Sequence, residues 1–119
     1  MPKSYSAEVE AYLARHPETR FLDAVMFDLV GSAIGKRYPM RDAGKVHESG
    51  VAFCAGITTL DARGACWDVN GIGFSDGDHD AIARPVPGTL VPVPWAAEST
   101  AQVLIQPSHP TEPGGWWFD

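Results

Sequence analysis

The sequence has 119 residues and a mass of 12.8 kDa, the size of one domain with a single modest core. Its hydrophobic fraction of 45% argues against disorder along the whole chain, and its formal charge of −6 argues against nucleic acid or an anionic membrane as partners. The start lacks an apolar signal core, and no apolar stretch approaches the ~20 residues of a membrane helix. We therefore expect a cytoplasmic protein that binds neither nucleic acid nor membrane.

Residues 6–16 give the clearest helix pattern. An apolar stripe at helical spacing is formed by Val9, Tyr12, Leu13 and His16. Ser6 is suited to cap the start of this helix, and Pro17 ends it.

An apolar run over residues 21–30 predicts a strand with one buried face. The residues that share this face are Phe21, Val25, Phe27 and Leu29, with Asp23 as an exception. A Gly-Ser turn signal follows, and residues 33–38 make a return strand. The sequence therefore predicts a β-hairpin over residues 21–38.

The middle of the chain is less regular. Residues 40–49 predict a short helix that Gly44 weakens, and a strand is expected near residues 57–60. Residues 61–80 hold four of the twelve glycines and five aspartates, which predicts a long loop that is the most mobile internal segment.

Short strands interrupted by proline follow. We expect strands at residues 81–84 and 89–91, with residues 91–95 confined by two prolines to a sheet edge or an irregular path. Residues 101–106 form the final strand. Its two faces alternate between Val103 and Ile105 on one side and Gln102, Leu104 and Gln106 on the other. One helix beside several short strands is an α+β pattern.

Three aromatic residues, Trp116, Trp117 and Phe118, stand next to the last residue of the sequence. Each could bury ~150–250 Å² of surface. Two interpretations stay open on composition alone. The segment folds back onto the core, or it belongs to a strand whose partners lie downstream.

A run of acidic residues, Asp76-Gly77-Asp78-His79-Asp80, resembles the start of a calcium loop. An EF-hand loop needs Gly at its sixth position and Glu at its twelfth. Those positions hold Ala81 and Pro87, so a solvated acidic turn is the favoured interpretation. A weak surface cation site is the alternative.

The spacing of the histidines, the cysteines and the glycine-lysine segment does not predict a metal, catalytic or phosphate-binding site. The histidines are His16, His47, His79 and His109, and none forms a close pair with another zinc ligand. Cys54 and Cys66 are expected to be reduced thiols, since two cysteines make no disulfide framework. Residues 31–36 contain glycines and end in lysine but lack the phosphate-loop spacing, which favours a hairpin turn.

A family resemblance rests on short motifs spread over residues 20–118. In chain order the motifs are Phe27-Asp28-Leu29-Val30-Gly31, Gly35-Lys36-Arg37, Leu60-Asp61, Gly77-Asp78-His79-Asp80, Pro85, Thr89-Leu90, Pro92-Val93-Pro94-Trp95 and Ala101-Gln102-Val103-Leu104. Their order and spacing resemble the N-terminal region of glutamine synthetase-type ligases, above all the γ-glutamylpolyamine and glutamine synthetase-like branch.

The resemblance implies a β-grasp fold, a small mixed sheet packed on one main helix. It implies that residues 1–119 form one N-terminal domain, with residues 107–119 as a tail toward a catalytic domain that is missing here. The family continues with an Asp-Pro-Arg motif, of which Asp119 would be the Asp. The aromatic residues before it would then belong to a severed chain.

In this family the domain forms one wall of an active site shared between adjacent subunits of a ring. The resemblance therefore implies a parent enzyme that is an ATP-dependent glutamate–ammonia or glutamate–amine ligase of nitrogen metabolism. ATP and magnesium would be bound by the catalytic half, with no cofactor in this chain. The chain alone would be inactive, and its partner would be the catalytic domain of the same or the adjacent subunit.

The resemblance points to Asp61 as the one candidate site residue. In the family an Asp in a Phe-Asp-Gly loop binds and deprotonates the ammonium. Asp61 has no aromatic residue before it and lacks the Gly-Ser-Ser that follows in glutamine synthetases, so the amine substrate stays open. The structural alternative is that Asp61 caps a turn with Gly64.

Two other classes of function compete with the ligase domain. The first is a free-standing β-grasp module that binds or regulates a partner through its hairpin edge. The second is a surface cation-binding protein that uses Asp76, Asp78 and Asp80.

Overall fold

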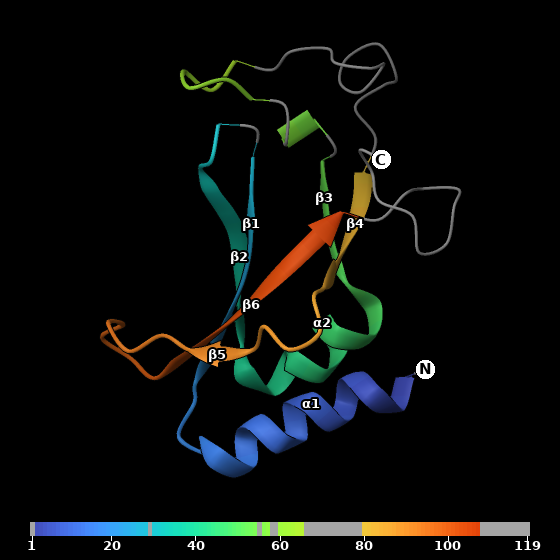
Figure 1. Ribbon diagram of the computed structural model, residues 1–119, viewed down its shortest axis with the longest axis vertical. Coiled ribbons are helices and arrows are strands. Elements are labelled where there is room, and N and C mark those ends of the chain that lie inside the picture. The colour runs from blue at the N-terminus through green and yellow to red at the C-terminus, as the bar shows by residue number, and fades with distance from the viewer. Residues whose placement is uncertain (1, 29, 55, 58–59, 66–79, 108–119) are drawn as a thin grey trace.

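The computed structural model describes residues 2–28, 30–54, 56–57, 60–65 and 80–107 (Figure 1). In chain order the elements are α1 (Pro2–Arg15), β1 (Phe21–Phe27), β2 (Ala33–Pro39), the 3-10 helix η1 (Met40–Asp42), α2 (Ala43–Ser49), β3 (Val51–Cys54), β4 (Asp80–Pro85), β5 (Val91–Pro92) and β6 (Thr100–Pro107). The predicted α+β class is confirmed: helices pack on a mixed, curled sheet, consistent with a β-grasp domain.

The sheet has the strand order β2-β1-β6-β4-β3, and β5 pairs with β6 outside this path. β1 and β6 run parallel, whereas the other described pairs are antiparallel. β2 and β3 are therefore the two edges of the main path. The predicted hairpin is confirmed, with β1 and β2 in register from Phe21–Pro39 to Phe27–Ala33.

The core lies between the helices and one face of the sheet. α1 and α2 contribute Val9, Tyr12, Ala43 and Val46, which pack against β1 and β6 side chains. The β6 side chains are Ala101, Val103 and Ile105, which confirms the alternation predicted for the final strand. The β1 side chains are Leu22, Ala24 and Met26.

The buried face predicted for β1 is wrong. Phe21 and Val25 are only half-buried, and Phe27 is 59% exposed, because the helices cover the opposite face of the strand. Both faces of this run are apolar in sequence, so the period of two cannot choose between them. Asp23, the one polar residue on the face predicted to be buried, lies on the face of β1 that the helices do not cover. Leu29 lies outside the described residues.

Three further boundaries differ from the expectations. α1 begins at Pro2, so Ser6 lies inside the helix and not before its first turn. The strand in this part of the chain is β3 (Val51–Cys54), which pairs with β4 and lies before the strand expected near residues 57–60. Ile57 lies in a 3-10 turn, and residues 58–59 lie outside the described residues. Leu60 forms only an isolated bridge. The short helix is confirmed as η1 and α2.

The proline-rich segment takes the edge path that was predicted. β5 is only two residues long and pairs with the start of β6. Within the described residues, no helix is long and apolar enough to cross a membrane.

Candidate functional site

The strand directions bring several connections to one end of the sheet, which we call the loop end. β1, β3 and β6 finish at this end, and β2 and β4 begin there. The β1–β2 connection and the segment that follows β3 therefore both leave from the loop end (Figure 1). Asp61, the predicted site residue, lies on the second of these segments.

Asp61 caps a tight turn. Its Oδ1 accepts hydrogen bonds from the backbone N–H groups of Arg63, at 2.8 Å, and Ala65, at 3.0 Å. The backbone closes the turn as well, since the N–H of Gly64 donates to the Asp61 carbonyl and the N–H of Asp61 donates to the Ala65 carbonyl. Gly64 has φ +82°, a left-handed conformation that favours glycine. The turn-capping interpretation is confirmed, and a role toward an amine stays a prediction.

The β1–β2 turn repeats the same arrangement at Asp28. Its Oδ1 accepts from the N–H groups of Val30, at 3.1 Å, and Ser32, at 2.8 Å. The N–H of Gly31 donates to the Asp28 carbonyl, the N–H of Asp28 donates to the Ser32 carbonyl, and Gly31 has φ +81°. A three-residue hairpin loop with a left-handed glycine has this pattern. Asp28 is a second turn-capping aspartate that the sequence analysis did not identify as one, although the shared Asp-x-x-Gly spacing was visible.

The two turns differ in what supports them. The Asp28 turn closes a hairpin of seven registered residue pairs in which the inner side chains of β1 are buried. The Asp61 turn instead follows the four-residue strand β3, which pairs with β4 at an edge of the sheet. The two turns therefore have the same pattern of hydrogen bonds, but the strands next to them differ in length and pairing.

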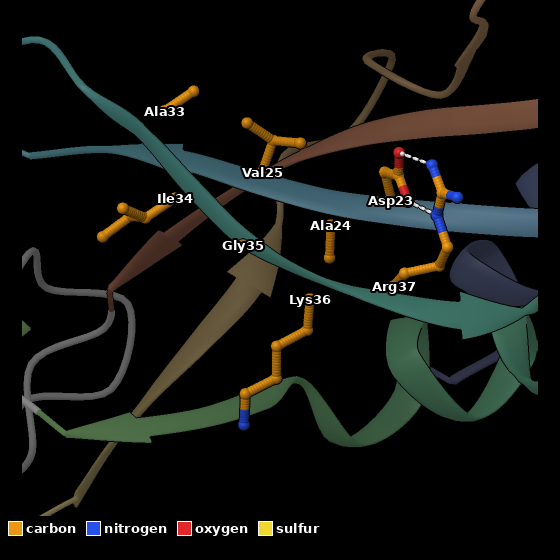
Figure 2. Close-up of a pocket in the computed structure, with 8 residues that line it drawn as sticks. All are labelled: Asp23, Ala24, Val25, Ala33, Ile34, Gly35, Lys36 and Arg37. Carbon is orange, nitrogen blue, oxygen red and sulfur yellow. Dashed lines mark hydrogen bonds and ion pairs between the residues drawn. The ribbon is translucent and has the colours of Figure 1, made fainter. Parts of the chain in front are cut away.

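A shallow, open pocket of about 270 Å³ lies over β1 and β2 (Figure 2). Gly35 is one of the residues that line it, and a Cβ there would overlap the carbonyl oxygen of Ala24. Val25 and Ala33 form an apolar wall, while Asp23 and Arg37 form a charged wall.

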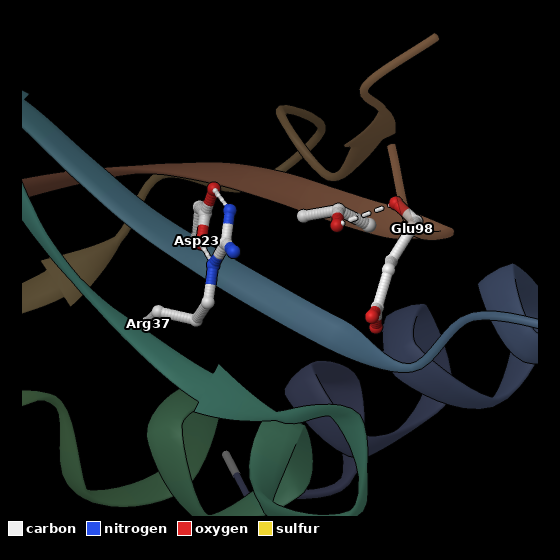
Figure 3. Close-up of polar contacts among 4 residues, drawn as sticks. Asp23, Arg37 and Glu98 are labelled. Carbon is white, nitrogen blue, oxygen red and sulfur yellow. Dashed lines mark hydrogen bonds and ion pairs between the residues drawn. The ribbon is translucent and has the colours of Figure 1, made fainter. Parts of the chain in front are cut away.

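The charged wall is a two-pronged ion pair. Arg37 donates to both carboxylate oxygens of Asp23, at 2.7 and 3.0 Å, and Figure 3 shows the two side chains facing each other across β1 and β2. The hydrogen bond and the charge of Asp23 raise the pKa of the Arg37 guanidinium above its usual value. The guanidiniums of Arg37 and Arg20 both lie about 5.5 Å or less from the centre of the Phe21 ring. Arg20 also pairs with Glu98, at 2.9 Å.

Residues 31–36 and His47, which the sequence analysis considered as possible binding residues, belong to the hairpin and to the core. Residues 31–36 form the hairpin turn and the start of β2, as expected. His47 is buried on α2, where its Nδ1 lies 2.9 Å from the Ala43 carbonyl oxygen. Among the described residues, no group of three or more His, Cys, Asp or Glu side chains is placed to hold a metal ion. Several predicted features lie outside the described residues: Cys66, the acidic run 76–79, His79, His109, and the tail 108–119.

Sequence comparison relates the chain to one ligase family. No protein-family model matches the chain. γ-Glutamylputrescine synthetase PuuA of Escherichia coli is 33% identical over 102 residues, which cover 86% of this chain and 21% of that enzyme. The chain is homologous to the N-terminal region of glutamine synthetase-like ligases.

Solved structures of these ligases share the fold. GmaS in complex with ADP superposes with a TM-score of 0.60 and 25% identity over 82% of this chain and 20% of its own. A novel glutamine synthase homologue, 19% identical over 83% of this chain and 23% of its own, gives a TM-score of 0.67. The glutamine synthetase of Plasmodium falciparum gives 0.56 at 13% identity, over 86% of this chain and 18% of its own. The chain therefore spans about a fifth of the length of these ligases.

Proposed function

We propose that this chain is the N-terminal β-grasp domain of an ATP-dependent glutamate–ammonia or glutamate–amine ligase. In this proposal the domain forms one wall of an active site shared between adjacent subunits of a ring, and it is inactive alone. The observation that carries the proposal is the 33% identity to a γ-glutamylputrescine synthetase across 86% of the chain.

The ligase reaction divides into two steps. ATP phosphorylates the γ-carboxyl group of glutamate, and the amine then displaces the phosphate to form the amide. Magnesium prefers oxygen ligands and neutralises phosphate charge in such reactions. We assign ATP and magnesium to the rest of the ligase, in line with the ADP bound to GmaS.

The proposed role of this domain in the second step belongs to Asp61. A carboxylate attracts a positively charged amine and can accept the proton that the amine must lose before it attacks. The two backbone donors on Asp61 Oδ1 hold the carboxylate in a fixed orientation. The class of amine, ammonia or a polyamine, is left open by the proposal.

A chimaeric enzyme tests this proposal. The matching region of Escherichia coli γ-glutamylputrescine synthetase is replaced by this chain, and ATP-dependent ligation of glutamate to putrescine and to ammonia is measured. We expect the chimaera to assemble like its parent and to turn over one of these amines, while the 119-residue chain alone shows no turnover. A chimaera that fails to assemble, or that assembles without activity, contradicts the proposal, as does ligase activity of the chain alone.

A further inference from the structure

Lys36 connects the two edge strands of the curled sheet. β2 and β3 lie at opposite ends of the strand order, yet the Nζ of Lys36 on β2 donates a hydrogen bond of 2.6 Å to the carbonyl oxygen of Ala52 on β3. Figure 2 shows this side chain leaving β2 on the side opposite Arg37 and running toward β3. The sheet is thus curled far enough for one lysine side chain to span the gap between its edges.

The Ala52 carbonyl lies where support from the rest of the sheet ends. In the described part of the chain, β4 pairs with β6 only at residues 83–85. Toward the loop end, β3 and β4 continue as a two-stranded ribbon from the Ala52–Ile82 pair to the Cys54–Asp80 pair. A ribbon of two strands is marginally stable by itself. Lys36 therefore contacts the ribbon at its first residue pair beyond the three-stranded region.

We propose that Lys36 is a positioning residue for the Asp61 turn. By tying β3 to the β1–β2 hairpin, it fixes the ribbon from which the chain continues to Asp61. The anchoring follows from the contacts of Lys36, whereas its consequence for an amine rests on the function proposed above for Asp61.

Lysine suits this task chemically. Its flexible stem spans the gap, and its ammonium group makes a charge-assisted hydrogen bond to a carbonyl, which is stronger than a neutral one. The methionine side chain is similar in length to that of lysine but has no hydrogen-bond donor. Lys36→Met therefore removes the bond while keeping most of the side-chain volume.

Lys45 offers a matched control. It lies exposed on α2, outside β2 and β3, and Lys45→Met removes the same charge from the chain. Methionine and lysine also have similar helix propensities, so this control leaves α2 intact.

Amide hydrogen exchange of the 119-residue chain tests the anchoring. In Lys36→Met we expect exchange to rise about fivefold in β3, in the first half of β4 and at the Gly64 and Ala65 amides, with β1 and β6 unchanged. Lys45→Met should match the unmodified chain throughout. Unchanged exchange in the ribbon, or a uniform increase that includes β1 and β6, overturns the proposal.

Kinetics of the chimaeric ligase test the consequence for the site. Because small displacements of a catalytic group reduce rates steeply, we expect Lys36→Met to lower kcat/KM for the amine about tenfold. The KM for ATP should stay unchanged, whereas a general loss of folding would lower the amount of active enzyme without changing the KM for either substrate. Normal amine kinetics in Lys36→Met overturn the positioning role. If Asp61→Asn also leaves amine kinetics normal, the function proposed for Asp61 fails as well, and the exchange experiment still decides the anchoring.

Discussion

The Asp28 turn and the Asp61 turn have the same hydrogen bonds but different surroundings. In each, one carboxylate oxygen accepts two backbone N–H groups, and a glycine three residues later adopts a left-handed φ. The first turn joins the edge strand β2 to β1, along seven registered pairs, and β1 also pairs with β6, whereas the second follows the four-residue edge strand β3, which pairs with β4. The hydrogen bonds of each turn are therefore determined by its local sequence. The strand pairing next to the turn determines how firmly the turn is held.

The largest expected effect on stability comes from a substitution in the β1–β2 hairpin that the Asp28 turn closes. Gly35→Ala would place a Cβ on the Ala24 carbonyl oxygen, so the β1–β2 hairpin must shift, and we expect a loss of about 3 kcal/mol in unfolding free energy. Gly64→Ala meets nothing within 4 Å and costs only its left-handed φ, about 1 kcal/mol. Urea unfolding of both variants measures the difference. Equal losses would show that the hairpin is no better anchored than the Asp61 turn.

A smaller effect is expected from the capping carboxylates. Asp28→Ala leaves two N–H groups of the hairpin turn without their acceptor and should lower the unfolding free energy by about 1 kcal/mol. Asp61→Ala also removes two such bonds, but from the turn that follows the short β3–β4 pair. It should leave the urea midpoint nearly unchanged and instead accelerate hydrogen exchange at Ala65. If both variants lose the same global stability, the proposed difference in support is wrong.

The smallest effect concerns the end of the domain opposite the two turns. Burial raises the pKa of Tyr12 on α1 and of Tyr38 on β2, because both phenols lose water around their charged form. Their contribution to stability is complete below the ordinary tyrosine pKa of about 10 and decreases as the pH rises through the raised value. Tyrosinate absorbance and urea midpoints across this range measure the effect. Tyr12→Phe should reduce it, whereas Asp28→Ala and Asp61→Ala should not.

Much of the fold could be predicted from local patterns. The Gly-Ser signal located the β1–β2 turn, the alternation of Val103 and Ile105 located the inner face of β6, and the prolines marked β5 as an edge. The inner face of β1 could not be predicted, since both faces are apolar and only the position of α1 and α2 selects Leu22. β3 was misplaced because its pairing with β4 joins residues far apart in the sequence.

Part of the candidate site could likewise be predicted from the sequence, and part could not. The turn at Asp61 follows from the Asp-x-x-Gly spacing, and the matching turn at Asp28 could have been found from the same spacing. The bond between Lys36 and Ala52 could not, because it depends on how far the sheet curls. Its two partners lie in elements that do not neighbour each other in the strand order.

The most direct test of the account compares Asp61→Asn with Asp28→Asn in the chimaeric ligase. Asparagine retains the Oδ1 acceptor, so both turns should keep their hydrogen bonds while each loses one negative charge. We expect Asp61→Asn to lower kcat/KM for the amine by a factor of about 100 or more with KM for ATP and glutamate unchanged. Asp28→Asn should behave like the unmodified chimaera. Amine kinetics that are equal in the two variants would contradict the assignment of Asp61 to the amine and leave both aspartates as turn caps.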